Sequence, residues 1–240
     1  SVIHLLLLTT LKILKELKMY SAQILKKYNS IIFDNDGVIM DSNAVKTEAF
    51  VKALEGEEDI LIEEFIDFHK AHGGVSRFEK IKYFYSNIKK DKNYLIPLKK
   101  TLERYSYYSK KALLSADLMP GVEDFLKLLK EHNKIVHVVS GSDQEELREI
   151  YKSRNLTQYF NQINGSPITK SDILKKIIED FKLTLPAVYF GDAMLDYSTA
   201  KKYNLDFIYI YSKSEWSEGI SFCKKMNCLI EPNFLENSET

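Results

Sequence analysis

From Pro120-Gly121 onward, short apolar runs rich in β-branched and aromatic residues alternate with segments whose apolar residues recur every three or four positions. The runs indicate β-strands and the segments indicate amphipathic helices. Because two parallel strands need a long crossover connection, usually a helix, this order predicts a parallel sheet with helices on both faces. We therefore expect a Rossmann-like α/β core with strands at KIVHVVS (134–140), NQING (161–165), AVYFG (187–191) and DFIYIY (206–211).

One further strand-like run, SIIF at 30–33, stands ahead of a block that is helical almost throughout. In this block, residues 43–115, apolar residues recur with helical spacing and Gly73-Gly74 interrupts the pattern. The first strand still has to join the sheet, so the block is predicted to be an all-helical domain inserted into the core. The expected parts are an N-terminal amphipathic extension (1–28), an α/β core (29–42 and 116–240) and the inserted domain (43–115).

The first residues of the chain have an amphipathic pattern. Their apolar run is far shorter than the roughly 20 residues that span a bilayer, and no basic stretch precedes it as in a signal peptide. In residues 1–18 the leucines fall roughly on one helical face and the lysines mostly on the other. We expect a helix that packs on the protein or mediates self-association and has no catalytic role.

The charge balance argues against a nucleic-acid or membrane partner. Lys and Arg number 34 and Asp and Glu number 34, so the formal net charge is zero. No basic field is therefore available to attract phosphate backbones or acidic lipids. Cys223 and Cys228 are the only cysteines, too few for a disulfide framework and typical of a reduced protein. We expect a cytoplasmic protein with a small-molecule ligand.

Polar and acidic residues stand where the predicted strands end. In open parallel sheets ligands bind just beyond these carboxyl ends, so such residues should gather at one edge. Two acids separated by one residue in an extended segment face the same side, and carboxylates so close together need a compensating charge. The residues are Asp34, Asp36 and Gly37 after the first strand, Ser140 and Gly141 after the second, Lys170 in SPITK, and Asp192 and Asp196 after AVYFG.

Each of these residues also has a purely structural interpretation. Asp34 and Asp36 could form a solvated turn, and Ser140 and Asp196 could cap the helices that follow. Lys170 could be an ordinary solvated residue of a first helical turn. The order and placement of all these residues together favour a functional site over the separate structural roles.

Four segments resemble the signature motifs of the haloacid dehalogenase superfamily. They are FDNDGVIMDS, HVVSG, SPITK and YFGDAMLD, and the resemblance extends over about residues 30–230. The chain is similar to the phosphatase branch that has a helical cap after the first strand, as in phosphoglycolate phosphatases and β-phosphoglucomutases. This resemblance implies that the inserted helical domain is a cap over an active site.

The resemblance also implies roles for the site residues. Asp34 would bind Mg²⁺ and attack phosphorus, giving an aspartyl-phosphate. Asp36 would protonate the departing oxygen, then activate water, and would bind the metal through its backbone carbonyl. The remaining implied metal ligands are Asp192 and Asp196. The phosphoryl group would be held by Ser140, Gly141 and Lys170.

The acid at position 36 favours phosphate chemistry within this family. Release of halide needs no proton, whereas phosphoester hydrolysis and phosphosugar mutation both use the second acid. We favour Mg²⁺-dependent hydrolysis of a small phosphomonoester such as a sugar phosphate. A phosphosugar mutase of the same fold is the alternative, and a catalytically silent binding or scaffold protein is a third.

The segment HKAHGGVSRFEKIKYFY of the helical domain is predicted to select the leaving group. By the same resemblance, its loop points into the active site. Arg77 could pair there with a carboxylate or a second phosphate, and His72 and Ser76 could donate hydrogen bonds. Alternatively, Gly73-Gly74 is a plain helix connector, Ser76 is an N-cap and Arg77 is a surface charge.

Overall fold

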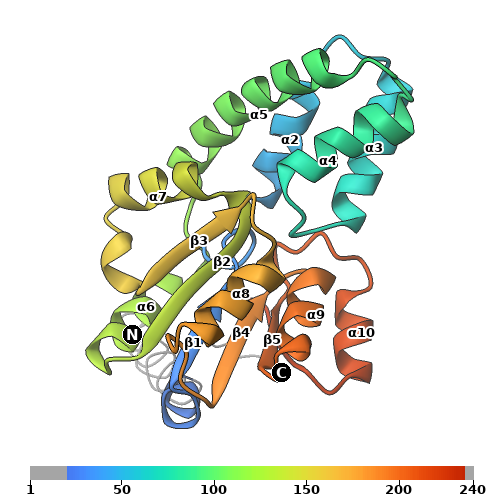
Figure 1. Ribbon diagram of the computed structural model, residues 1–240. Coiled ribbons are helices and arrows are strands. Elements are labelled where there is room, and N and C mark those ends of the chain that lie inside the picture. The colour runs from blue at the N-terminus through green and yellow to red at the C-terminus, as the bar shows by residue number, and fades with distance from the viewer. Residues whose placement is uncertain (1–20, 236–240) are drawn as a thin grey trace, which may run out of the picture.

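A computed structural model describes residues 21–235, which contain a six-stranded sheet. The strand order is β3-β2-β1-β4-β5-β6 and every adjacent pair is parallel (Figure 1). The order changes direction at β1, between β2 and β4, which is where ligands bind in such sheets. The strands are β1 Ser30–Phe33, β2 Ile135–Asp143, β3 Gln162–Ser166, β4 Ala187–Gly191, β5 Asp206–Ile210 and β6 Leu229–Glu231.

Helices cover both faces of the sheet, which confirms the predicted α/β core. Ile31 and Phe33 pack in one apolar cluster and Ile32 in another, as the two-residue repeat of a strand requires. The first cluster includes the buried apolar residues of α6 and α7, and the second includes those of α8 and α10. The helices are α6 Val122–Glu131, α7 Gln144–Ser153, α8 Lys170–Glu179, α9 Met194–Lys202 and α10 Gly219–Lys225.

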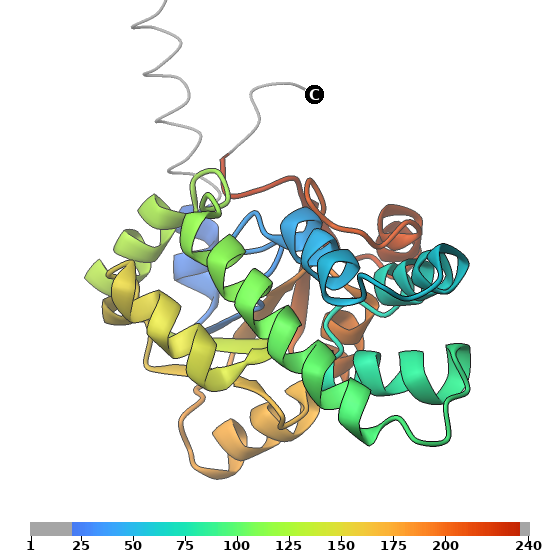
Figure 2. The same ribbon diagram turned by 90° about the horizontal axis from the view of Figure 1, so that it is seen from above.

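The inserted block forms a helical cap beyond the carboxyl ends of the strands. In Figure 1 the strand arrows point toward it, and Figure 2 shows the long helix α5 crossing above the sheet. The cap has its own apolar cluster, in which the rings of Phe50 and Tyr105 stack with centroids 3.9 Å apart. Its α-helices are α2 Asn43–Ala53, α3 Asp59–Ala71, α4 Arg77–Tyr83 and α5 Leu95–Ser115.

The helical pattern of residues 76–90 does not continue as one α-helix. After α4 the chain forms a π-helical turn at Phe84–Ile88, and the Lys89 N–H bonds to the Phe84 carbonyl at 2.8 Å, five residues back. The wider turn buries Phe84, Tyr85 and Ile88 together in the cap cluster. This packing offsets the poorer hydrogen-bond geometry of a π turn.

Two short antiparallel segments connect the cap to the core. Met40 and Leu118 form a β-bridge, and the Asp41 N–H donates to the Asp117 carbonyl at 2.9 Å. The chain therefore leaves and re-enters the core at adjacent points. This pairing has the geometry of a two-stranded hinge.

Residues 21–27 are helical and lie against the core. Ile24 and Tyr28 are buried in the same apolar cluster as Ile31, and the Tyr28 hydroxyl donates to Asp206 Oδ2 at 2.7 Å. The amphipathic helix expected over residues 1–18 lies outside the described residues. Within residues 21–235, none of the helices combines the length and apolar character needed to cross a bilayer.

Candidate active site

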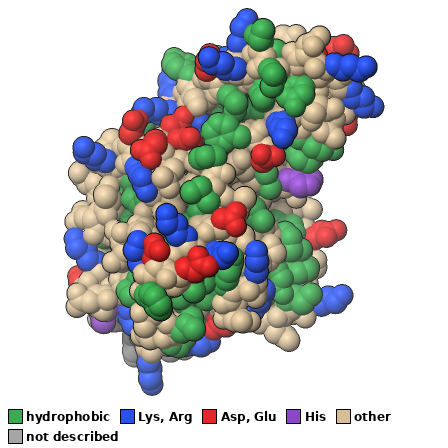
Figure 3. All heavy atoms as spheres, in the orientation of Figure 1, with side chains coloured by type: hydrophobic (Ala, Val, Ile, Leu, Met, Phe, Trp, Pro, Cys, Tyr) green, Lys and Arg blue, Asp and Glu red, His purple; other side chains and the backbone are tan. Residues whose placement is uncertain are grey.

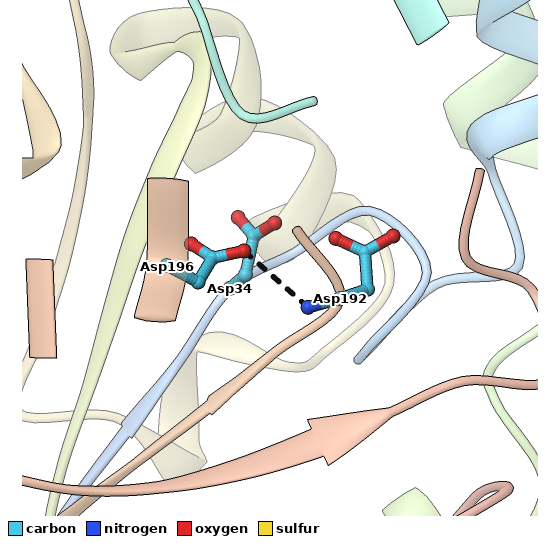
Figure 4. A group of neighbouring side chains, drawn as sticks. All are labelled: Asp34, Asp192 and Asp196. Carbon is cyan, nitrogen blue, oxygen red and sulfur yellow. Dashed lines mark hydrogen bonds between the residues drawn. The ribbon is translucent and has the colours of Figure 1, made fainter. Parts of the chain in front are cut away.

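Three carboxylates from the segments that follow two neighbouring strands meet at the edge of the sheet below the cap. Asp34 follows β1, Asp192 follows β4, and Asp196 lies in the first turn of α9. A carboxylate oxygen of each lies within 4.8 Å of the others (Figure 4). The meeting follows from the parallel register, because Phe33 pairs with Phe190 and both strands therefore end at one level. The predicted gathering of strand-end acids is thus present in the fold.

Lys170 supplies the positive charge within this cluster. Its Nζ lies 2.7 Å from Asp196 Oδ1 and 2.9 Å from Asp34 Oδ1, and its side chain is 1% exposed. Lys175 and Lys176, which follow on the same helix, are exposed to solvent. Thr169 caps the helix by accepting the Asp172 N–H, so the first turn points the Lys170 side chain into the site. The interpretation of Lys170 as a solvated lysine is therefore wrong.

The pKa values reflect the crowding of charges. Burial raises the pKa of Asp34 to about 7 against the opposing effect of Lys170. Burial, Asp34 and Asp196 together raise the pKa of Asp192 well above its usual value. Burial lowers the pKa of Lys170, but Asp196 and Asp34 outweigh it and the net shift is upward. Ionising all three carboxylates would leave two negative charges beyond the one that Lys170 matches, and the raised pKa values of Asp34 and Asp192 reflect the cost of that excess.

These residues fit a small divalent cation. Mg²⁺ prefers oxygen ligands and is usually bound by one or two carboxylates together with substrate phosphate. Asp34, Asp192 and Asp196 present such oxygens, and two positive charges would match the excess that Lys170 leaves. Asp196 Oδ2 also accepts the backbone N–H groups of Asp192 and Ala193, at 3.3 and 3.2 Å. The capping interpretation of Asp196 therefore holds as well, and its other oxygen is held by Lys170.

Asp36 lies outside this triad and is held by a network of its own. Its carboxylate accepts from Lys46 Nζ at 2.6 Å, Ser42 Oγ at 2.6 Å and Ser142 Oγ at 2.9 Å. Burial raises its pKa, but Lys46 and the two hydroxyl groups outweigh burial and bring the pKa to about 2. Asn35 Nδ2 also donates to this carboxylate at 3.0 Å, so four donors favour the ionised form of Asp36. Its predicted metal contact through the backbone stays a prediction.

Gly37 is required by the close approach of other groups to the backbone. It has φ +74°, and a Cβ built on it would lie 2.4 Å from both Asp192 Oδ2 and Asn43 Nδ2. Those two groups are themselves hydrogen-bonded at 2.6 Å. The expectation that glycine permits close approach at this position agrees with the geometry.

The two predicted phosphate-binding residues near the end of β2, Ser140 and Gly141, lie in different surroundings. Gly141 faces the space under the cap, and a Cβ built on it would lie 2.2 Å from the Gly74 carbonyl oxygen of the cap loop. Ser140 is fully buried, and its Oγ accepts the Ser142 N–H at 3.1 Å. Ser142, which the sequence analysis did not select, faces the space and contacts Asp36.

The cap loop residues take different positions. His72 ends α3, is exposed, and bonds through Nδ1 to the Phe68 carbonyl at 2.7 Å. Ser76 caps α4. Arg77 is not a surface charge, because its side chain is 3% exposed and lies 2.7 Å from Glu146 on helix α7 of the core. Its role toward substrate stays a prediction.

A cavity of about 260 Å³ separates the cap from the edge of the sheet. Figure 3 shows histidine and hydrophobic side chains on the surface of one face, where the cap meets the core. We call the acidic side of the cavity the core wall and the basic side the cap wall. The core wall is Asp34, Asp36 and Asp192, and the cap wall is Lys46, Arg77 and Lys80.

Sequence reasoning missed several residues that line the cavity. Lys46, Lys80 and Glu215 line the cavity, yet each stands in a stretch that resembles an ordinary solvated helix or loop. Only the packing of the cap on the core buries them. Ser142 could have been found, because it is a second hydroxyl group at the same strand end as Ser140.

A model of haloacid dehalogenase-like hydrolases matches residues 31–210. No significant match was found among the curated proteins. Among solved structures, a predicted phosphatase of Clostridium acetobutylicum is 22% identical, with TM-score 0.66 over 85% of this chain and 93% of that one. A predicted phosphoglycolate phosphatase of Haemophilus somnus is 16% identical, with TM-score 0.67 over 87% and 95%. CbbY of Rhodobacter sphaeroides, a variant bound to xylulose-(1,5)bisphosphate, is 15% identical, with TM-score 0.67 over 88% and 96%. At these identities the likeness concerns the fold.

Proposed function

The chain belongs to the haloacid dehalogenase-like hydrolase family, and on that premise we propose that it is a Mg²⁺-dependent phosphatase of small phosphorylated metabolites. The observation that carries this proposal is the meeting of Asp34, Asp192 and Asp196 with Lys170 at the strand ends. Asp36, two residues beyond the nucleophile position, lines the same cavity. The small cavity favours a metabolite over a macromolecular substrate.

In the first half of the proposed reaction, an Asp34 carboxylate oxygen attacks phosphorus and the bond to the ester oxygen breaks. The products are an aspartyl-phosphate and the departing alcohol. Lys170 holds the Asp34 carboxylate in place and stabilises negative charge on the transferring phosphoryl group. Bound Mg²⁺ would offset the repulsion between the anionic substrate and the carboxylates.

Asp36 is the proton donor and acceptor in this proposal. It gives a proton to the alkoxide oxygen as that oxygen leaves, and then takes a proton from the water that hydrolyses the aspartyl-phosphate. Its pKa of about 2 depends on Lys46, so an anionic substrate that draws Lys46 away raises that pKa and allows protonation. The ionised form that the low pKa of Asp36 favours is the form needed in the second half of the reaction.

Release of inorganic phosphate from a panel of phosphomonoesters, with Mg²⁺ and with a chelator, tests the proposal. We expect release with Mg²⁺ and less than about 1% of that rate after chelation, with recovery when Mg²⁺ is restored. An isomerised product without free phosphate would instead indicate a phosphosugar mutase. No turnover of any member would contradict both and favour a binding protein.

A further inference from the structure

Four cationic side chains around the cavity are each at most 11% exposed. Three of them have a carboxylate partner within 2.9 Å. Lys80 is the exception, since no carboxylate among residues 21–235 forms an ion pair with it. The paired ones are Lys46 with Asp36, Arg77 with Glu146, and Lys170 with Asp34 and Asp196.

Lys80 is held in place by a neutral histidine. Its Nζ donates to His69 Nδ1 at 2.7 Å and to the His69 carbonyl at 3.2 Å. The Thr47 hydroxyl gives its hydrogen to Glu215 Oε1, so it accepts from His69 Nε2 at 2.9 Å and leaves Nδ1 bare as an acceptor. Burial and the nearby lysines lower the pKa of His69 to about 2, which keeps the ring neutral. Two of the three N–H groups of the Lys80 ammonium thus donate hydrogen bonds, and both acceptors, His69 Nδ1 and the His69 carbonyl, are uncharged.

An ammonium buried without a counter-ion is costly to the folded protein. Burial and Lys46 lower the pKa of Lys80 to about 7, and Glu215 and Asp36 oppose this shift only in part. The ring centroid of Phe50 lies 6.0 Å from Nζ. An anionic group entering the cavity would supply the missing partner.

We propose that Lys80 binds a second anionic group of the substrate, a carboxylate or a phosphate on the leaving group, and so selects substrates that carry one. This inference rests on the proposed function. The reacting phosphoryl group belongs at the core wall, where Asp34 and Lys170 lie, so the rest of the substrate extends toward the cap wall. Lys80 lines that wall in the same cavity as Asp34. Of the basic groups there, it is the one whose charge is not already matched.

A matched pair of substrates isolates this contact. Phosphoglycolate and 2-hydroxyethyl phosphate differ only in a carboxylate against a hydroxymethyl group, and ethylene glycol bisphosphate tests a second phosphate. For the wild-type protein we expect kcat/KM at least ~10-fold higher for one doubly anionic compound than for 2-hydroxyethyl phosphate. Lys80→Met should bring that ratio close to one, mainly through KM. Lys82→Met, an exposed lysine on the same helix, should leave the ratio unchanged.

Thermal unfolding of the metal-free proteins separates this role from a structural one. If Lys80 awaits an anion, Lys80→Met removes an uncompensated charge and the melting temperature stays level or rises by a few degrees. A large fall in melting temperature would contradict the inference, as would an unchanged substrate ratio in folded Lys80→Met. A wild-type ratio near one for both anionic compounds would also overturn it while leaving phosphatase activity in place. No phosphate release from any compound would instead remove the proposed function.

Discussion

The two walls of the cavity differ in charge and in origin. The core wall is acidic and is made where parallel strands end, so its residues follow β1 and β4 in short contiguous motifs. The cap wall is basic and is made by residues spread over α2 and α4. A ligand that satisfies both walls brings a cation to the first and anionic oxygens to the second. A metal ion together with a phosphorylated metabolite meets that requirement.

Asp34→Asn gives the largest expected effect and tests the core wall. It removes the proposed nucleophile, so phosphate release should fall by at least ~10⁴-fold. The variant also removes one of three clustered carboxylates, so the metal-free protein should unfold at the same or a higher temperature. Steady-state kinetics and thermal unfolding measure the two effects. Substantial residual activity would exclude a route through an aspartyl-phosphate.

Lys170→Met tests whether the core wall depends on its one internal cation. We expect a fall in kcat of ~10²–10³-fold, because a group that stabilises the transferring phosphoryl oxygens is lost. Asp34 and Asp196 also lose their partner, so the metal-free protein should lose about 3 kcal/mol of unfolding free energy, part of which Mg²⁺ restores.

Lys176→Met is the matched control for this substitution, since Lys176 is an exposed lysine of the same helix. It should change neither kcat nor the unfolding free energy measurably. If Lys170→Met and Lys176→Met had the same kcat and the same unfolding free energy, the buried ion pairs of Lys170 would contribute nothing to the site.

The difference in origin between the core wall and the cap wall also explains which site residues the sequence could predict. Asp34, Asp36, Asp192 and Lys170 could be found because the carboxyl ends of parallel strands converge, which brings local motifs together without knowledge of packing. The strands themselves were predicted to within about three residues, since their apolar runs are short and bounded. The cap wall had no comparable signal. Lys80 becomes buried through the packing of whole helices, which no local pattern encodes.

Gly141→Ala probes the contact between the two walls. A Cβ at this position would lie 2.2 Å from the Gly74 carbonyl oxygen of the cap loop, so the methyl group should hold the cap away from the core. We expect a fall in kcat/KM of ~10-fold from poorer closure over the substrate. Mg²⁺ affinity, measured by calorimetry, serves as the control and should stay the same. A full rate in this variant would show that the cap loop need not approach Gly141 during turnover.

The smallest expected effect is a pH dependence of stability that arises from His69 on the cap side. Its pKa is about 2 when folded and near 6.5 when unfolded. Between these values the unfolded chain binds the extra proton, so the unfolding free energy falls as the pH drops below about 6.5, by up to about 2 kcal/mol at pH 5. Lys80, whose pKa in the folded protein is lowered to about 7, is largely protonated in both states below about pH 6 and adds little slope there, but it adds a slope of the same sign at higher pH.

His69→Gln removes this titration and keeps one acceptor and one donor, so urea unfolding between pH 5 and 6, below the titration of Lys80, should show a shallower dependence than in the wild-type protein. The control His72→Gln changes an exposed ring and should keep the wild-type slope. His137, whose pKa burial also lowers, contributes equally to all three proteins and cancels in the comparison. Identical slopes for His69→Gln and wild type would mean that His69 can take up a proton inside the folded cap. In that case the ring would carry a positive charge of its own, and Lys80 would lose the acceptor that now orients it toward the cavity.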